Sequence, residues 1–185
     1  GQSPTFTATT DDAGVVFRAP CGGATTKNSG YPRCELREMQ ADGATKAAWS
    51  TEDPKHHVLS ARLAVTALPT KKPHVVCAQI HDADDDLLMI RLEQRQLFIE
   101  RPGERDVLLQ SDYALGTPFD LDIDGGAGRV RIRFNGREAL DWPVRRSGCY
   151  FKIGCYTQSS VARGDLAEAA GEVVVYRLQL TSPER

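Results

Sequence analysis

Hydrophobic and polar residues alternate with a period of two along most of this chain, and sustained helical periodicity is hard to find. This alternation is typical of strands that cover a core with one face. The clearest segments of this kind are 14–20, 33–39, 58–68, 74–81, 87–93, 96–100, 119–124, 129–134, 149–158 and 172–180. Ten strands at short spacing predict an all-β fold, an antiparallel two-sheet sandwich of the jelly-roll type. A parallel α/β fold would need crossover helices, which the pattern does not predict.

One hairpin and one helix can be placed from local signals. Asn135-Gly136 suits a type I′ turn and follows strand 129–134, so we expect a hairpin with the segment that comes next. The apolar residues of that strand should face the core, and its three arginines should face solvent. Segment 163–171, "RGDLAEAAG", is the helical candidate and would make about two turns.

The length and charge of the chain indicate a single domain and argue against some classes of protein. The chain has 185 residues, enough for one substantial core, and we expect a single domain over residues 1–185 that acts as a monomer. No apolar run approaches the roughly 20 residues of a membrane helix. The formal net charge of −2 argues against a nucleic-acid binder, which usually carries a basic surplus.

Cysteines and aspartates give little sign of a metal site. The five cysteines form no CxxC pair and have no histidine at metal-ligand spacing. Cys21 and Cys34 are the best candidates for a local disulfide, and five free buried thiols are an equal alternative. We interpret "DLDIDG" (120–125) as a strand rather than a calcium loop, and "DADDD" (82–86) as a solvated turn. We therefore predict no metal site.

Three predicted strands carry unusually polar faces. In "YFKIGCYTQ" (150–158), Phe151, Ile153 and Cys155 alternate with a polar set on the opposite face. The three polar faces are Arg33, Glu35 and Arg37; Cys77, Gln79 and His81; and Tyr150, Lys152, Tyr156 and Gln158. If they line one concave sheet, they supply cations, an amide, an imidazole and two phenols. This surface would suit an anionic, hydroxyl-rich ligand.

Such a set of side chains permits β-elimination on a sugar acid. Arginine and glutamine can neutralise the sugar carboxylate, so that the proton beside it becomes easier to remove. A histidine or an ionised tyrosine can take the proton, and an acid can protonate the leaving glycosidic oxygen. Hydrolysis is less well served, because it normally uses two facing carboxylates and only Glu35 lies among these faces.

The same segments resemble a known enzyme family. "YPRCELREM", "QIH" and "YFKIGCYTQ", in this order, are similar to the three signature segments of the alginate lyases of polysaccharide lyase family 7, which read R-S/T-E-L-R, Q-I/V-H and Y-F-K-A-G-x-Y-N-Q. The resemblance spans roughly residues 14 to 181. It implies a β-jelly roll with a long open groove. It also implies a secreted enzyme that cleaves an anionic polysaccharide endolytically and needs no cofactor.

The resemblance also implies roles for individual residues. Arg33 and Gln79 would neutralise the substrate carboxylate, His81 would assist or act as base, and Tyr156 would be the acid and in some cases also the base. The residues expected to bind neighbouring sugars or line the groove are Arg37, Lys152, Gln158 and Tyr150.

The substrate itself is left open by this pattern. "QIH" rather than "QVH" favours guluronate, and Thr157, where the family has Asn, is the change we expect to alter loop geometry or subsite preference. Mannuronate, mixed blocks and another polyuronate such as β-1,4-glucuronan are alternatives. A non-catalytic carbohydrate-binding jelly roll is the competing class, but it would leave His81 and Tyr156 without a role.

Overall fold

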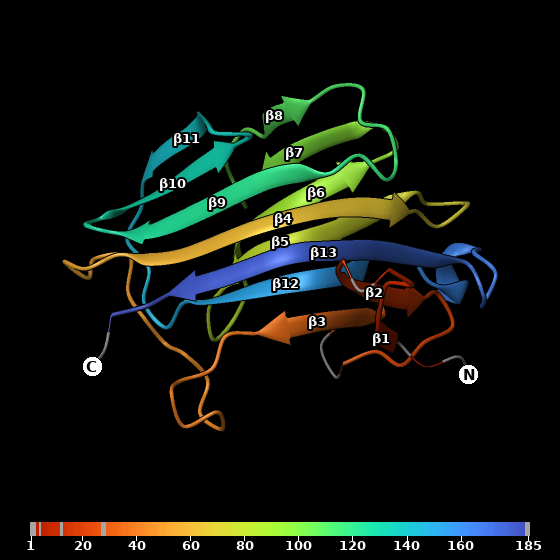
Figure 1. Cartoon of the computed structure of the whole chain (residues 1–185), viewed down its shortest axis with the longest axis horizontal. Helices are drawn as coiled ribbons and strands as arrows, with labels where there is room; N and C mark the ends of the chain where they lie inside the picture. The colour runs from red at the N-terminus through yellow and green to blue at the C-terminus, as the bar shows by residue number, and fades with distance from the viewer. Residues whose placement is uncertain (1–2, 4, 12, 27–28, 184–185) are drawn as a thin grey trace.

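Two antiparallel sheets stack face to face in the computed structural model, which describes residues 3, 5–11, 13–26 and 29–183 (Figure 1). The strands are β1 (Thr5–Ala8), β2 (Val15–Pro20), β3 (Arg33–Arg37), β4 (His57–Ala67), β5 (His74–His81), β6 (Asp86–Glu93), β7 (Gln96–Glu100), β8 (Val107–Gln110), β9 (Phe119–Gly126), β10 (Arg129–Phe134), β11 (Arg137–Pro143), β12 (Tyr150–Thr157) and β13 (Ala170–Thr181). One sheet has the order β1-β2-β13-β4-β9-β10-β11 and the other β3-β12-β5-β6-β7-β8. The predicted jelly-roll fold is confirmed.

The predicted strands agree closely with the observed ones. Each of the ten segments coincides with a strand, and the Asn135-Gly136 hairpin joins β10 to β11 with positive φ at both turn residues (49° and 77°). On β10, Val130 and Ile132 are fully buried, whereas Arg129 faces out and pairs with Asp141. The pattern missed β1 and β8, which have four residues each. Strands this short are poorly marked by alternation.

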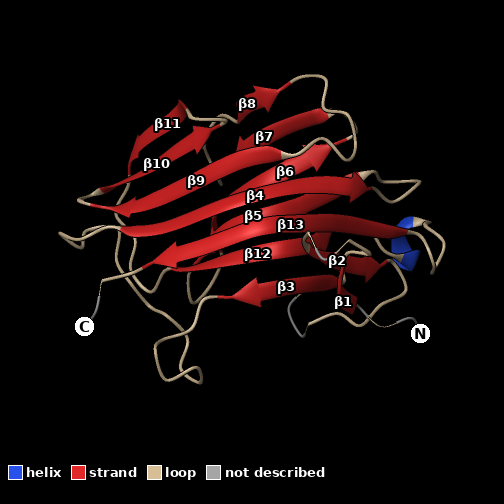
Figure 2. Ribbon diagram, in the orientation of Figure 1, coloured by secondary structure: helices blue, strands red, loops and turns tan. Residues whose placement is uncertain are grey.

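The predicted helix over 163–171 is wrong. Within the described residues the only helix is a 3₁₀ turn, η1 (Val161–Arg163), visible as the short blue element in Figure 2. The carbonyls of Ala167 and Ala169 accept hydrogen bonds from the backbone amides of Gly22 and Cys21. These bonds hold the segment against the residues after β2, and Gly164, in a left-handed conformation with φ of 87°, ends the 3₁₀ turn.

The hydrophobic core lies between the two sheets and includes the predicted inward face of β12. Phe151, Ile153 and Cys155 of β12 all belong to it, as expected. Cys77, predicted to share a face with Gln79 and His81, also lies in the core and is fully buried, so this prediction is wrong. The pairing of β5 with β6 shifts register between Val76 and Ala78, and such a bulge reverses the alternation, so Val76 packs beside Tyr156 instead.

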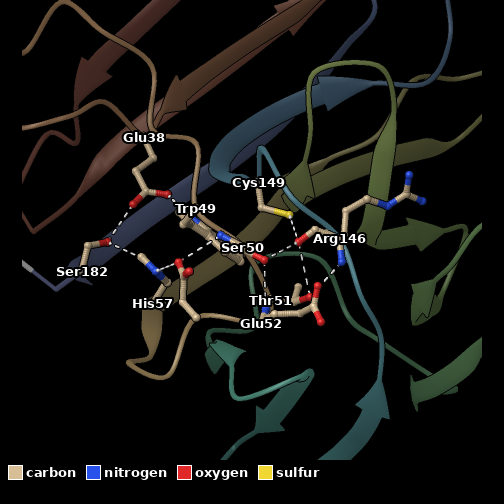
Figure 3. Close-up of polar contacts among 10 residues, drawn as sticks. Glu38, Trp49, Ser50, Thr51, Glu52, His57, Arg146, Cys149 and Ser182 are labelled. Atoms are coloured by element: carbon tan, nitrogen blue, oxygen red, sulfur yellow. Dashed lines mark hydrogen bonds and ion pairs between the residues drawn. The ribbon is translucent and has the colours of Figure 1, made fainter. Parts of the chain in front are cut away.

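A buried polar network anchors the start of β12 (Figure 3). The carboxylate of Glu38 accepts hydrogen bonds from the Trp49 indole (2.9 Å), the Phe151 amide (3.0 Å) and the Ser182 hydroxyl (2.8 Å). The imidazole of His57 stacks on Trp49 with ring centroids 4.8 Å apart. These contacts tie the segment after β3 and the end of β13 to the strand that carries the polar residues described next.

All five cysteines are free thiols, so the Cys21–Cys34 disulfide is not formed. Cys21 is buried, and the Cys34 thiol instead points to the carbonyl of Thr5 (3.3 Å). Among the described residues, no helix has the length and apolar character needed to span a membrane.

Candidate active site

A cleft of about 710 Å³ opens over β3, β12 and β5, on the face of the six-stranded sheet that points away from the core. Six of the eight predicted site residues line it. They are Arg33, Arg37, His81, Tyr150, Lys152 and Tyr156. Three segments distant in the sequence therefore bring their polar faces together, as the alternation predicted.

Strand register positions these side chains. β12 is flanked by β3 on one side and β5 on the other. The paired residues are Lys152 with Arg37 and Gln79, Tyr156 with Arg33, and Tyr150 with His81. Each of these pairs therefore places a β12 side chain next to a polar side chain on an adjacent strand. Side chains that are directly opposite in a sheet are close enough to interact.

Tyr156 occupies one end of the cleft. Its ring lies under the guanidinium of Arg33, with 3.8 Å between Cζ and the ring centroid, and Lys152 Nζ is 6.0 Å from the same centroid. The phenol oxygen is 3.0 Å from Ser29 Oγ. Ser29 was not predicted as a site residue, and its position in a loop before β3 gave no periodic signal. The tyrosine thus lines the cleft with two cations near its ring and the Ser29 hydroxyl next to its own.

Glu35 lies at the centre of the site although we had assigned it no role. Its carboxylate is 3.1 Å from Lys152 Nζ and 3.7 Å from Arg33, and it accepts a hydrogen bond from the Gln79 amide. The Glu35 and Lys152 side chains are only 3% and 4% exposed. Burial lowers the pKa of Lys152, and the nearby Glu35 carboxylate opposes this shift. The alternating charges of "RCELR" were the available sequence signal for this carboxylate.

His81 has a defined tautomer. Its Nδ1 is 2.6 Å from the carbonyl oxygen of Asp82, and since a carbonyl only accepts, Nδ1 carries the hydrogen. The Tyr150 hydroxyl lies 3.1 Å from the same nitrogen, and the two rings stack. In the neutral imidazole, Nε2 is therefore the basic nitrogen, and it lies 3.6 Å from the carboxylate of Asp86.

Asp86 is a second carboxylate that the sequence did not single out. It begins β6, where strand pairing sets it opposite His81. Burial raises its pKa, although the charges of His81 and Lys152 oppose the shift. The rest of the 82–86 turn is built differently from the simple solvated turn we predicted, since Asp82 is buried and accepts from the amides of Asp84 and Asp85.

Two predicted site residues do not line the cleft. Gln79 is fully buried beneath it, with its amide group directed to Glu35 and its Oε1 atom without a hydrogen-bond partner. Gln158 follows β12, is 7% exposed, and donates its backbone N–H to the carbonyl of His74. Within the described parts of the chain, no three His, Cys, Asp or Glu side chains are grouped closely enough to hold a metal ion.

Thr157, expected to affect subsite preference, points away from the cleft. Its side chain is fully buried, donates to the carbonyl of Ala19 (2.7 Å) and accepts from the amide of Gly171 (3.1 Å). Ile80 of the "QIH" segment is also fully buried in the core. Neither residue can contact a bound sugar directly.

The family model described as alginate lyase matches residues 1–182. The chain belongs to this alginate lyase family. It is 48% identical to alginate lyase AlgAT5 from polysaccharide lyase family 7, with a TM-score of 0.92 over 95% of this chain and 81% of that one. It is 39% identical to an alginate lyase from Corynebacterium sp., with a TM-score of 0.91 over 98% and 82%. No match was found among curated protein sequences.

A third structure adds a ligand. It is a variant of the family 7 alginate lyase A1-II′ in complex with a product, GGG, and it is 25% identical with a TM-score of 0.80 over 95% of this chain and 82% of that one. The family and the similar structures identify this chain as a polysaccharide lyase.

Proposed function

We propose that this alginate lyase cleaves the 1,4-glycosidic bonds of alginate by β-elimination within the chain, and releases unsaturated uronate oligosaccharides. The observation that carries the proposal is the grouping of the Tyr156 phenol, the Arg33 guanidinium and the Nε2 side of His81 around one open cleft. A cleft that is open to solvent along the sheet accepts a polymer at any point of its length, which supports an endo mode of action.

Neutralisation of the substrate carboxylate is the first step. Arg33 offers a charged, planar donor group at the cleft surface. Gln79 lies beneath the cleft and donates to Glu35, so in this arrangement it acts by holding the Glu35 carboxylate near Arg33. With its charge balanced, the substrate carboxylate can accept the negative charge that develops when the neighbouring C5–H bond breaks.

Proton transfer then completes the elimination. His81 Nε2, or Tyr156 when the proton lies on its side, takes the proton from C5. The electron pair of the C5–H bond forms the C4=C5 double bond, and the C4–O bond to the leaving sugar breaks. The Tyr156 hydroxyl donates its proton to the leaving oxygen. Arg37, Lys152 and Tyr150, which line the cleft, are proposed to hold the sugars on either side.

A single variant tests this proposal. Tyr156→Phe removes the hydroxyl and keeps the ring that packs under Arg33, so we expect turnover to fall by about 10²–10⁴-fold with polymer binding retained. Product formation is followed by the absorbance of the new conjugated double bond, and product sizes by mass spectrometry. Turnover at the unaltered level would remove Tyr156 from this role. Digesting poly-guluronate, poly-mannuronate and glucuronan separately identifies the polymer, and absence of unsaturated products from all three would refute the proposed reaction.

A further inference from the structure

Three side chains form a cationic cluster just beyond the Tyr156 end of the cleft. We call Tyr31, Lys72 and Arg163 the Tyr31 cluster. Tyr31 precedes β3, Lys72 lies in the loop between β4 and β5, and Arg163 ends η1, and these segments meet at one end of the sandwich (Figure 1). None of the three residues was predicted as a site residue.

The cluster is ordered by direct contacts. Lys72 Nζ donates a hydrogen bond to the Tyr31 hydroxyl (3.2 Å) and lies 4.9 Å from the centroid of its ring. Arg163 Cζ lies 5.9 Å from the same centroid. Burial raises the pKa of Tyr31, but the hydrogen bonds and charges of Lys72 and Arg163 outweigh it and lower the pKa overall. The Tyr31 hydroxyl therefore lies in a region of excess positive charge.

This positive charge has no carboxylate to balance it. Among the described residues, no Asp or Glu side chain lies within ion-pair distance of Lys72 or Arg163, whereas Arg91, Arg95 and Arg129 all have such partners. Asp165 is close in sequence to Arg163, but its carboxylate is buried and accepts hydrogen bonds from the amides of residues 70–72 and from Ser159. Two cations thus lie against the same tyrosine ring without a carboxylate at ion-pair distance.

The cluster is continuous with the reacting end of the cleft. The Tyr31 and Tyr156 rings meet edge to face with centroids 6.5 Å apart. The Tyr31 amide donates to Ser29 Oγ (3.2 Å), and the same oxygen lies 3.0 Å from the Tyr156 hydroxyl. A polymer that lies over Tyr156 and continues past this end of the cleft would reach the Tyr31 cluster.

We propose that the Tyr31 cluster is an additional subsite, which binds the carboxylate of a uronate residue beyond those held in the cleft. The proposal rests on the proposed function for the nature of the polymer. Lys72 and Arg163 would supply charge-assisted hydrogen bonds to that carboxylate, and Tyr31 would hold Lys72 in place. The subsite acts only on chains long enough to reach it.

The test compares binding across a ladder of alginate oligosaccharides of increasing length. The double variant Lys72→Gln/Arg163→Gln removes the two charges, and Lys55→Gln/Arg145→Gln removes two charges from exposed positions on the loop before β4 and the segment after β11. Dissociation constants are measured by calorimetry at two salt concentrations, since loss of charge contacts reduces the dependence of affinity on salt. Every protein in this comparison, the otherwise unaltered enzyme included, carries Tyr156→Phe, so that the oligosaccharides are bound and not cleaved.

We expect the first variant to lose about tenfold in affinity for long oligosaccharides, which corresponds to about 1.4 kcal/mol. It should bind the shortest oligosaccharides as the unaltered enzyme does, and the control variant should match the unaltered enzyme at every length. An equal loss at all lengths, or no loss at any, would overturn the subsite. If the unaltered enzyme binds none of the oligosaccharides, the proposed substrate itself fails, and the subsite fails with it.

Discussion

Arg33 covers the ring of Tyr156 at 3.8 Å although the two residues belong to strands at opposite ends of the sequence. The contact exists because β3 and β12 pair in the register that sets these residues opposite each other. The geometry of the candidate site therefore depends on how closely the backbones of β3 and β12 approach each other.

Gly154→Ala should displace β3 from β12 and disturb the site without changing any site side chain. Gly154 has φ of 142°, and a Cβ built there would lie 2.5 Å from the carbonyl oxygen of Cys34 and 2.9 Å from Glu35 Cα. The backbone conformation alone costs about 1–3 kcal/mol for a residue with a side chain, and the overlap adds to it. Urea unfolding measures the loss of stability, and the elimination assay the loss of activity.

Gly30→Ala is the matched control for that substitution. A Cβ at Gly30 would meet nothing within 4 Å, and its backbone angle is not in the left-handed region. We expect a change of less than about 0.5 kcal/mol in the free energy of unfolding. If both variants lose stability equally, the close approach at Gly154 is not the cause.

Glu35→Gln should destabilise the enzyme by about 3–5 kcal/mol, because it leaves Lys152 buried without its counter-ion. The Gln79 amide can still donate to the new side-chain oxygen, so the substitution removes the negative charge and keeps this hydrogen bond. Adding Lys152→Met to this variant should recover most of the loss. Urea unfolding of the two single variants and the double variant gives the coupling free energy, and additive effects would show that the ion pair contributes little.

Much of this arrangement could be predicted from the sequence because alternation is a local property. The polar faces of β3 and β12 follow from it directly, and six of the eight named residues do line the cleft. Alternation cannot reveal a bulge, so the position of Cys77 was wrong. It also cannot reveal contacts between loops, and for this reason Ser29 and the Tyr31 cluster were missed. Their positions depend on how three separate segments pack.

Asp86→Asn should make the enzyme more stable at neutral pH. Burial raises the pKa of Asp86 in the folded enzyme above its ordinary value of 3.8, so the folded state holds this proton more tightly than the unfolded state does. The free energy of unfolding therefore falls as the pH rises through the interval above 3.8, and the ionised carboxyl weakens the fold at pH 7. Asparagine removes this penalty.

The pH dependence of that gain is the measurement. Melting temperatures of Asp86→Asn and the unaltered enzyme, recorded from pH 7 down to pH 3, should converge as the native carboxyl becomes protonated. Asp84→Asn, at an exposed position in the same turn, is the control and should show no such trend. A gain of the same size at every pH would mean that ionisation of Asp86 is not its origin.

Thr157→Val should lower stability and leave substrate preference unchanged. The threonine hydroxyl donates to the carbonyl of Ala19 and accepts from the amide of Gly171, so it links β12 to the opposite sheet. Valine has nearly the same shape but leaves both buried groups without this partner, at a cost of about 1–3 kcal/mol for each. The side chain does not reach the cleft. The ratio of kcat/KM on poly-guluronate to that on poly-mannuronate should therefore equal the ratio of the unaltered enzyme, measured at a temperature where both are folded. A changed ratio would show that this position affects the subsites through the backbone of β12, and that the Thr–Asn difference from the family signature does influence the choice of sugar.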